Sequence, residues 1–299
     1  MLRPPLLKAN DEIRILTTAR KVSLEEIQEA KKWLEVLGYR VSLGDSLGLE
    51  DHQYGGNDVE RAEDFQAALD DHEIKAIWFA RGGYGSIRVL EKINWDQFIK
   101  NPKWLIGFSD ITIWHNLVNQ FYGIQTLHAL MPLTFPKASE EAKNLLAQNL
   151  TGNFPDIRWS ASNYNRGNQA IEGEIIGGNL SILYSLLGTK SGFNTNGKIL
   201  FIEEIDEYLY HIDRMMMSLK LAGKLSGLKG LLVGGFTDMK DNEIPFGKSY
   251  QEIILEHTAD GDYPVYFDFP AGHIDDNRPL ILNAKVKIES AEIMRLGYI

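Results

Sequence analysis

The sequence contains no cysteine, and this absence removes several kinds of chemistry. Without thiols the chain forms no disulfide bonds, has no thiolate nucleophile and offers no sulfur ligands to a metal. The absence also agrees with a reducing compartment, in which disulfides are rare. Any active site in this chain must therefore work without cysteine.

Long apolar runs and clusters of positive charge are lacking as well. The longest apolar runs, such as 230–236, fall far short of the roughly 20 residues that a membrane span requires. The stretch "MLRPPLLKANDEIRIL" has a proline pair and charges where a signal peptide needs an unbroken apolar core. With 31 basic and 41 acidic residues the formal charge is −10, which disfavours nucleic acid or an anionic membrane as partner. We expect a soluble, cytoplasmic protein.

The first half of the 299 residues alternates apolar runs with amphipathic segments. Strands are predicted at 13–17, 39–43, 74–80 and 104–108, and helices at 23–37, 58–70, 86–93 and 111–122. The turns between them are rich in Gly, Ser or Asp. This alternation predicts right-handed crossovers and an α/β domain with a mostly parallel, flavodoxin- or Rossmann-like sheet.

The pattern changes after Pro136. A helix is predicted at 139–150, and residues 151–169 are polar, rich in Gly and Asn and without a period. The remainder predicts strands at 170–176, 197–205, 228–236, 263–269 and 279–289, with helices from 177 and around 208–224. We therefore expect an N-terminal α/β domain over 1–150, a linker over 151–169, and a smaller strand-rich α/β domain over 170–299.

The stretch "GFSD" (107–110) joins a buried strand to a helix through a sharp corner. Gly107 removes a side chain from this corner, and the helix that follows points its free N–H groups toward Ser109. One interpretation is a nucleophile with the N–H of Asp110 as oxyanion donor, as in the G-x-S-x-G elbow, although Ile111 replaces the last glycine. The alternative is that Ser109 or Asp110 simply caps the helix.

A second strand–glycine–helix junction is "ARGGYGSIRVL" (80–90). It is neither a P-loop nor a G-x-G-x-x-G motif, so nucleotide binding is only weakly indicated. On a neighbouring parallel strand this loop would lie beside Ser109, where an N–H of Gly82 or Gly83 would complete an oxyanion hole. The alternative is a tight turn that needs glycine. Arg81 is a candidate for binding an anionic group of a substrate, or else forms a surface ion pair.

Acidic residues and a histidine in the second half have the types that activate a serine. Glu203 ends an apolar strand, where a carboxylate must be exposed or paired, whereas Glu204 is expected to be solvated. His273 lies in a loop, where it is either exposed or a proton acceptor whose tautomer a carboxylate would fix. Gly178 and Asn179 begin a helix and are candidates for binding a substrate's carboxylate or backbone.

A metal site is the alternative to a serine nucleophile. Glu207 and His211 stand four residues apart, on one face of a predicted helix, with Asp213 nearby. Zinc usually binds histidines in pairs or together with cysteines, and the other histidines do not have such a spacing. We therefore expect no metal and no cofactor.

Five segments occur together in a recognisable order. They are "ARGGYGSIRVL", "LIGFSDIT", "IIGGNLSIL", "ILFIEEIDEYLYHIDRMM" and "PAGHIDDN", and they span positions 80 to 277. In this combination the chain resembles the LD-carboxypeptidase family of serine peptidases, which includes muropeptide LD-carboxypeptidases and microcin C self-immunity proteins. The resemblance implies an N-terminal α/β domain that holds a serine and a C-terminal domain that supplies an acid and a histidine.

The catalytic triad implied by the resemblance is Ser109, Glu203 and His273. Strand alternation puts Glu203 and Glu204 on opposite faces, so only one of them can point toward the histidine. The resemblance also implies an oxyanion hole formed by backbone N–H groups of Gly83 and Asp110, with Gly82 as a further candidate. Because the resemblance supplies a base and an orienting acid for Ser109, helix capping becomes the less favoured interpretation of the corner.

The implied reaction is hydrolysis of an amide between an L-residue and a terminal D-residue, typically release of D-Ala from murein tetrapeptide. The implied partner is thus a small peptide, and family members are often homodimers. The alternatives are cleavage of a peptidyl or aminoacyl sulfamoyl-adenylate, as in the microcin branch, and a non-catalytic protein that binds an anion or nucleotide. Two segments depart from the family pattern. "LHALMPLTF" replaces a His-Gly-Pro-type turn, and "LTTARKVS" replaces a turn with Pro and Gly, altering one wall of the substrate cleft.

Overall fold

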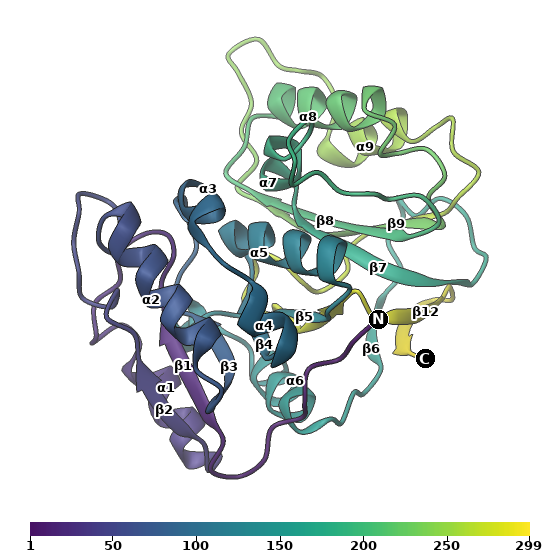
Figure 1. The fold of residues 1–299 in the computed structure, drawn as a ribbon. Helices are drawn as coiled ribbons and strands as arrows, with labels where there is room; N and C mark the ends of the chain where they lie inside the picture. Colours follow the sequence, from purple (N-terminus) through teal and green to yellow (C-terminus); the bar gives the residue numbers. More distant parts are fainter. The chain divides into compact units, whose positions relative to one another are not determined.

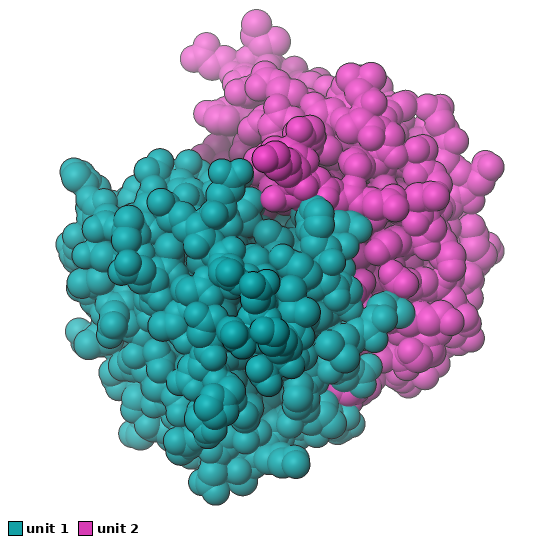
Figure 2. All heavy atoms as spheres, viewed as in Figure 1, with its two compact units in different colours: residues 1–153, 275–281 teal, residues 154–274, 282–299 magenta.

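The computed structural model describes residues 1–299 and divides them into two compact units. The first unit consists of residues 1–153 and 275–281, and the second of residues 154–274 and 282–299 (Figure 2). The chain passes from the second unit into the first directly after Ile274 and returns after Ile281. Each unit has a sheet of its own.

A six-stranded sheet with the order β11-β5-β4-β3-β1-β2 is the centre of the first unit (Figure 1). Its strands are β1 Glu12–Leu16, β2 Arg40–Leu43, β3 Ile74–Phe79, β4 Trp104–Gly107, β5 Thr126–His128 and β11 Leu280–Leu282. Strands β1 to β5 pair in parallel. Their carboxyl ends therefore meet at one edge of the sheet, which is where ligands bind in folds of this kind.

Helices connect these strands. They are α1 Gln28–Val36, α2 Asp58–Asp70, α3 Ser86–Val89, α4 Asp96–Lys100, α5 Thr112–Leu117 and α6 Glu140–Thr151, with short helical turns η1 Leu90–Lys92, η2 Ser109–Ile111, η3 Val118–Tyr122 and η4 Pro132–Lys137. Strand order reverses after β2, so right-handed crossovers place α1 on one face of the sheet and α2 to α5 on the other. The contacts agree, because α2 packs on α3 and α4, and α3 packs on α5.

Aromatic side chains anchor this helix layer to the sheet. The ring of Phe65 in α2 lies 5.4 Å from that of Phe79, 5.9 Å from Trp95 and 4.9 Å from Trp114 in α5. All four are buried. A buried ring of this kind removes roughly 150–250 Å² from water and contributes about 4–6 kcal/mol before the entropy of ordering it is subtracted. This packing holds α5, and with it the turn that precedes α5, at the end of β4.

The second unit is built on a seven-stranded sheet with the order β10-β9-β8-β7-β12-β13-β6. Its strands are β6 Ile157–Ser160, β7 Ile171–Asn179, β8 Ile199–Ile205, β9 Gly230–Thr237, β10 Val265–Tyr266, β12 Lys285–Glu289 and β13 Ile293–Tyr298. Strands β7 to β10 pair in parallel, whereas β12 pairs antiparallel with β7 and β13, and β13 with β6. Helices α7 Leu180–Ser185, α8 Leu209–Leu221 and α9 Tyr250–His257 cover one face of the parallel half (Figure 1).

These sheets confirm the predicted α/β fold class, with a mostly parallel N-terminal sheet and a more strand-rich C-terminal part. The predicted strand at 279–289 is divided, because Asn283 has a left-handed backbone (φ 62°) and separates β11 in the first sheet from β12 in the second. The expected linker at 151–169 contains β6, whose residues alternate between buried and exposed as an edge strand does. None of the helices combines the length and apolar character that crossing a membrane demands.

Candidate active site

Ser109 follows β4 with a left-handed backbone. Its φ is 64°, a region that costs a residue with a Cβ atom roughly 1–2 kcal/mol relative to glycine. The residue opens η2 and leads directly into α5. A strained turn from strand to helix exposes the side chain at the edge of the sheet, as in the nucleophile elbow of hydrolases. An ordinary helix cap has an extended backbone, so this conformation is not that of a cap.

Gly107 allows the corner to close. A Cβ atom at this position would lie 3.0 Å from Cγ1 and 3.2 Å from Cγ2 of Ile111, which is tighter than ordinary packing. The carbonyl oxygen of Gly107 accepts hydrogen bonds from the N–H of Ala129 (3.1 Å) and from Nε2 of His115 (2.8 Å). Burial lowers the pKa of His115 to about 4, against an opposing hydrogen bond to Gly107, so this ring is neutral and structural near neutral pH.

The loop after β3 lies against the serine. A Cβ atom at Gly82 would lie 3.0 Å from Cβ of Ser109, 3.2 Å from its Oγ and 3.3 Å from the backbone nitrogen of Asp110. Any side chain at Gly82 would therefore crowd both the hydroxyl and this N–H group. Gly83, next in the loop, has a left-handed backbone with φ 101°. Gly82 thus has a second purpose besides forming a turn, because its missing side chain leaves space beside Ser109.

The carboxylate of Asp110 joins this loop to the serine turn. Its Oδ2 accepts a hydrogen bond of 2.8 Å from the N–H of Ser86 at the start of α3, and the side chain is buried. Burial raises the pKa of Asp110, although hydrogen bonds from Ser86 and the charges of Arg61 and Arg20 oppose the rise. Asp110 therefore bonds the neighbouring helix and does not cap its own.

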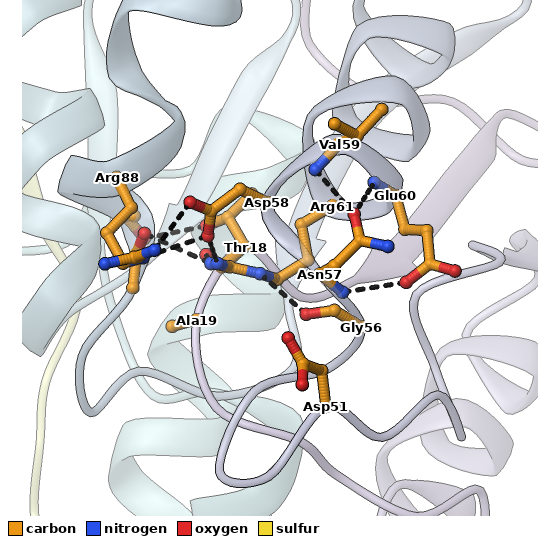
Figure 3. A network of polar contacts seen from close by, with 12 residues as sticks. Thr18, Ala19, Asp51, Gly56, Asn57, Asp58, Val59, Glu60, Arg61 and Arg88 are labelled. Atoms are coloured by element: carbon orange, nitrogen blue, oxygen red, sulfur yellow. Dashed lines mark hydrogen bonds and ion pairs between the residues drawn. The ribbon is translucent and has the colours of Figure 1, made fainter.

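A buried arginine also bonds this loop, and Figure 3 shows its contacts with Thr18, Gly56 and Asp58. The guanidinium of Arg61 in α2 donates to the carbonyl oxygens of Thr18, Gly85 and Gly56 and pairs with Asp58. Its side chain is fully buried. Losing a buried charge that is bonded in this way typically costs several kcal/mol. Arg61 consequently ties the loop after β1 to the loop after β3.

The sequence analysis does not single out Arg61. It also does not predict the hydrogen bond between Ser86 and Asp110. A capping box at Asn57 and Glu60 signals the start of α2, but nothing in it indicates that Arg61 turns inward. Arg81, which was singled out, donates to the backbone oxygen of Lys21 at 2.9 Å. Part of its guanidinium is therefore occupied by the protein itself.

In the second unit the predicted acid and histidine lie together. Nδ1 of His273 is 2.7 Å from Oε2 of Glu203, whose side chain is completely buried. Burial by itself lowers the pKa of His273, but the charge of Glu203, the hydrogen bond to it and the charge of Glu204 outweigh burial and raise that pKa above 6.5. A carboxylate bonded to Nδ1 leaves Nε2 as the ring nitrogen that accepts a proton from a substrate or nucleophile.

An irregularity in the sheet makes room for the histidine loop. The register between β8 and β9 shifts between Ile202 and Glu204. Opposite this shift, a Cβ atom at Gly234 would lie 2.4 Å from the carbonyl oxygen of Ala271, and the N–H of Gly235 donates to that oxygen at 2.8 Å. The loop thus packs on β9 by main-chain contact. Gly272, with φ 115°, lies where this loop passes Glu203. A Cβ atom at Gly272 would be 2.8 Å from Cβ of Glu203, so only glycine lets the loop pass this closely.

Glu204 is buried, so the expectation that it is solvated is wrong. Oε1 accepts from Nδ2 of Asn179 and from the N–H of Ile205, both at 2.9 Å, and Oε2 accepts from the N–H of Ser181 at 2.7 Å. Burial, and next the charge of Glu203, raises the pKa of Glu204 to about 7, against these hydrogen bonds. The sequence pattern predicts exposure because the residue is charged, whereas two donors at the start of α7 and the N–H of Ile205 in β8 allow the carboxyl group to be buried.

Asn179 and Gly178 have structural contacts of their own. Oδ1 of Asn179 accepts from the N–H of Ile182 and caps α7, while its amide nitrogen holds Glu204. Gly177 and Gly178 have φ values of 130° and 140°, and a Cβ atom at Gly177 would overlap the carbonyl oxygen of Phe201. These glycines are therefore required where β7 meets β8. Substrate binding by Gly178 and Asn179 stays a prediction.

Glu207 and His211 bind each other, with Nδ1 of the imidazole 2.6 Å from Oε2 of the carboxylate. Asp213 is bonded elsewhere, to Nε2 of His257 at 2.7 Å. Residues 1–299 contain no group of three or more His, Cys, Asp or Glu side chains placed to hold a metal ion. His128, in the segment that departs from the family pattern, is buried with its ring 5.8 Å from that of Phe108.

The structure thus forms two groups of the predicted residues. Ser109, Asp110, Gly82 and Gly83 lie together in the first unit, and Glu203 and His273 lie together in the second. A strained serine beside the backbone nitrogen of Asp110, and a histidine bonded to a buried carboxylate, are the kinds of group that a serine-type hydrolase uses.

Comparison with known proteins identifies the family. Residues 13–129 match the LD-carboxypeptidase N-terminal domain, and residues 172–288 match the LD-carboxypeptidase C-terminal domain. A probable murein peptide carboxypeptidase of Bacillus subtilis is 32% identical, over 97% of this chain and 92% of the relative. A murein tetrapeptide carboxypeptidase of Pseudomonas aeruginosa is 29% identical, over 89% of each. The chain belongs to the LD-carboxypeptidase family, and it is accordingly a serine-type carboxypeptidase.

Solved structures share the fold at lower identity. A muramoyltetrapeptide carboxypeptidase from Oxalobacter formigenes superposes with a TM-score of 0.86 at 24% identity, covering 96% of this chain and 98% of that one. The microcin C7 self immunity protein MccF, in complex with aspartyl sulfamoyl adenosine, superposes with a TM-score of 0.88 at 20% identity, covering 98% and 97%. Both branches named in the sequence analysis therefore have this two-part α/β architecture.

The left-handed backbone of Ser109 leads to a prediction about stability. Ser109→Gly should be more stable than Ser109→Ala by about 1 kcal/mol, because only alanine has a Cβ atom to strain at positive φ. Urea unfolding measures the difference. The matched control is Ser185→Gly against Ser185→Ala in helix α7. There the glycine variant should be less stable than the alanine variant by about 1 kcal/mol. Equal signs at the two positions would show that Ser109 is not strained.

The raised pKa of Glu204 leads to a prediction about pH. The folded protein binds this proton more tightly than the unfolded chain, so the stabilisation is complete below pH 4.5 and is lost as the pH rises toward 7. The loss is on the order of 3 kcal/mol. Urea unfolding from pH 4.5 to 8 should show this decline in the wild type and not in Glu204→Gln. Glu25→Gln, at an exposed position, is the control, and a decline that persists in Glu204→Gln would assign it to other groups.

Proposed function

We propose that this carboxypeptidase hydrolyses the amide between an L-residue and a C-terminal D-residue, releasing D-Ala from murein tetrapeptide. The observation that carries the proposal is the left-handed backbone of Ser109 at the end of β4, which a capping serine would not need. The names of the relatives in Bacillus subtilis and Pseudomonas aeruginosa support the murein peptide as substrate. The reaction belongs to the recycling of cell-wall peptides.

In the proposed mechanism Ser109, His273 and Glu203 act as a triad. Nε2 of His273 takes the proton of the serine hydroxyl while Oγ attacks the carbonyl carbon of the L-residue. The C–N bond then breaks, D-Ala leaves with the proton from His273, and a water molecule hydrolyses the acyl-enzyme by the same proton route. Glu203 fixes the tautomer and stabilises the imidazolium, for which the 2.7 Å contact to Nδ1 is suited.

The course of the chain supports a common site. Two residues after His273, the chain enters the first unit at Asp275. The carbonyl oxygen of Asp275 accepts from the N–H of Ser139 at 2.8 Å, so this end of the histidine loop is attached to the unit that carries Ser109. A two-residue tether limits how far His273 can move from that attachment. The proposal requires Nε2 of His273 to reach hydrogen-bonding distance of the serine.

The oxyanion of the tetrahedral intermediate would be bound by the backbone N–H groups of Asp110 and Gly83, with Gly82 as a further donor. The space left by the missing side chain of Gly82, about 3.2 Å from Oγ of Ser109 and 3.3 Å from the nitrogen of Asp110, supports this assignment. Losing one such donor typically lowers the rate roughly 10²- to 10³-fold. The bonds of Asp110 and Arg61 to the loop therefore have a catalytic purpose, because donors must be held in place before the reaction.

The enzyme is expected in the cytoplasm, where released wall peptides are recycled, and as a homodimer, as family members often are. Arg81, Gly178 and Asn179 are proposed to contact the peptide. Size-exclusion chromatography with light scattering measures the oligomeric state directly.

The direct test is incubation with murein tetrapeptide and detection by mass of the loss of one alanine. The wild type should release D-Ala, and Ser109→Ala should abolish release while leaving the melting temperature almost unchanged. Ser185→Ala, in α7, is the matched control and should remain fully active.

Parallel reactions separate the alternatives. Full activity of Ser109→Ala would end the triad proposal. Turnover of an aminoacyl sulfamoyl-adenylate, without turnover of the tetrapeptide, would favour the microcin-type activity, and binding without turnover would favour a non-catalytic role. Activity lost to a chelator and restored by zinc would favour Glu207 and His211 instead.

The raised pKa of His273 predicts the acidic limb of the pH profile. The histidine must be neutral to accept a proton, so kcat/KM should fall as the pH drops through an apparent pKa above 6.5. Glu203→Gln removes the main group that raises this pKa, so the limb should move to lower pH while the rate falls by about 10⁴-fold. Glu207→Gln is the control and should leave the limb in place. An unchanged limb in Glu203→Gln would separate Glu203 from the catalytic histidine.

A further inference from the structure

Arg20 lies along the glycine loop beside the serine, in the segment that departs from the family pattern. A Cβ atom at Gly83 would be 2.6 Å from Cδ, 2.9 Å from Cγ and 3.0 Å from Nε of Arg20. The left-handed glycine thus leaves room for the arginine side chain to cross the loop. The backbone N–H of Arg20 also points to the carbonyl oxygen of Gly82, at 3.4 Å.

The backbone that carries Arg20 is firmly held. The carbonyl oxygen of Arg20 accepts a hydrogen bond of 3.0 Å from Oγ1 of Thr17. Its backbone also forms an isolated antiparallel β-bridge with Tyr54. On either side, the carbonyl oxygen of Thr18 accepts from Arg61, and the N–H of Lys21 donates to the chain at Gln53 at 2.9 Å. The starting point of the Arg20 side chain is therefore preorganised, so binding a ligand there costs little backbone entropy.

The guanidinium of Arg20, in contrast, has no partner within residues 1–299. It takes part in no hydrogen bond or ion pair, and the residue is exposed. Its three neighbours of the same type are all engaged: Arg61 with Asp58 and three carbonyl oxygens, Arg81 with the backbone of Lys21, and Arg88 with Asp58 at 2.8 Å. An unpaired arginine on a rigid backbone is suited to bind a carboxylate with two parallel hydrogen bonds.

The position of Arg20 fits a carboxylate close to the scissile bond. Gly82 contacts Ser109 and Gly83 contacts Arg20, and neighbouring Cα atoms are about 3.8 Å apart, so Nε of Arg20 lies within about 13 Å of Oγ of Ser109. The carboxylate oxygens of a terminal D-residue are four bonds from the attacked carbon, and the attack distance, these bonds and a hydrogen bond together span at most roughly 12 Å, which is compatible with that upper limit. The charge of Arg20 also acts on Asp110, next to the nucleophile.

The overall charge of the protein gives a local cation a clear use. With a formal charge of −10, the chain repels an anionic peptide at long range. A carboxypeptidase must nevertheless select the end of a peptide, and the end differs from every internal amide by its carboxylate. A single free cation beside the nucleophile supplies both attraction and selection.

We propose that Arg20 binds the C-terminal carboxylate of the leaving D-residue and so restricts this enzyme to the ends of peptides. This inference rests on the proposed function. A carboxylate on the side chain of the third residue could bind Arg20 by the same chemistry. The test therefore includes one substrate that lacks the terminal carboxylate and one that lacks the carboxylate of the third residue.

The experiment compares Arg20→Ala and Arg20→Lys with the wild type on three substrates. The first is the tetrapeptide acid with diaminopimelate as its third residue, and the second is the same peptide with a C-terminal amide. The third keeps the C-terminal acid but has lysine at the third position, which removes the side-chain carboxylate of diaminopimelate. Arg20→Ala should lower kcat/KM for both acids about 10- to 100-fold and leave the amide unaffected, because a hydrogen-bonded charge pair is worth that factor. Arg20→Lys should fall in between, since it keeps the charge and loses the two-pronged geometry.

A matched control is Arg40→Ala, which changes the net charge equally at the start of β2, away from the carboxyl ends of the strands, and should leave all three rates unchanged. Equal losses on acid and amide in Arg20→Ala, or no loss at all, would overturn the proposal. A loss on the diaminopimelate acid that is absent on the lysine acid would assign Arg20 to the third residue and overturn it likewise.

Calorimetric binding to Ser109→Ala separates this inference from the proposed function. The tetrapeptide acid should bind Ser109→Ala about 10- to 100-fold more tightly than the amide does, and Arg20→Ala in the same background should abolish that difference. If the wild type proved inactive while this difference was present, the proposed function would fail and the role of Arg20 would stand. Equal binding of acid and amide to Ser109→Ala would refute the role of Arg20, whatever the activity.

Discussion

The hydrogen bond from the N–H of Ser86 to the carboxylate of Asp110 is the contact on which the first half of the site depends. It joins two turns that follow neighbouring strands, one carrying Gly82 and Gly83 and the other carrying Ser109. Burying a carboxylate is costly unless it is hydrogen-bonded, and here Oδ2 of Asp110 accepts the bond from Ser86 while Arg61 donates to the carbonyl oxygen of Gly85 in the same loop. The strain at Ser109 can persist because these buried bonds over-determine the turn.

In the second unit, two adjacent carboxyl groups are buried near the end of β8. Alternation along the strand sends Glu203 and Glu204 to different partners, a histidine in one case and the start of α7 in the other. The two groups still affect each other, because the charge of Glu203 helps to raise the pKa of Glu204, and both charges raise that of His273. The proton affinity of the histidine is therefore a property of the whole cluster.

Much of the fold could be predicted from the sequence, because strands and helices differ in the period of their apolar residues. The strand before Ser109, helix α2 and the alternation in the first half were found from this period alone. The division of 279–289 between two sheets could not be found, since Asn283 interrupts an apolar run without a proline or glycine. Short strands such as β5 and β6 also escaped, because they are stabilised by their neighbours more than by their own composition.

The sequence by itself determined the residue types of the site, through motifs whose order resembles one family, and it determined that Ser109 stands at a sharp corner. Only the tertiary structure decided that Glu204 is buried, that Arg61 turns inward, and that Arg20 is left without a partner while the arginines near it are engaged. The physical reason is that burial and pairing depend on donors and acceptors from distant segments. A charged side chain has the same appearance in a sequence whether such partners meet it or not.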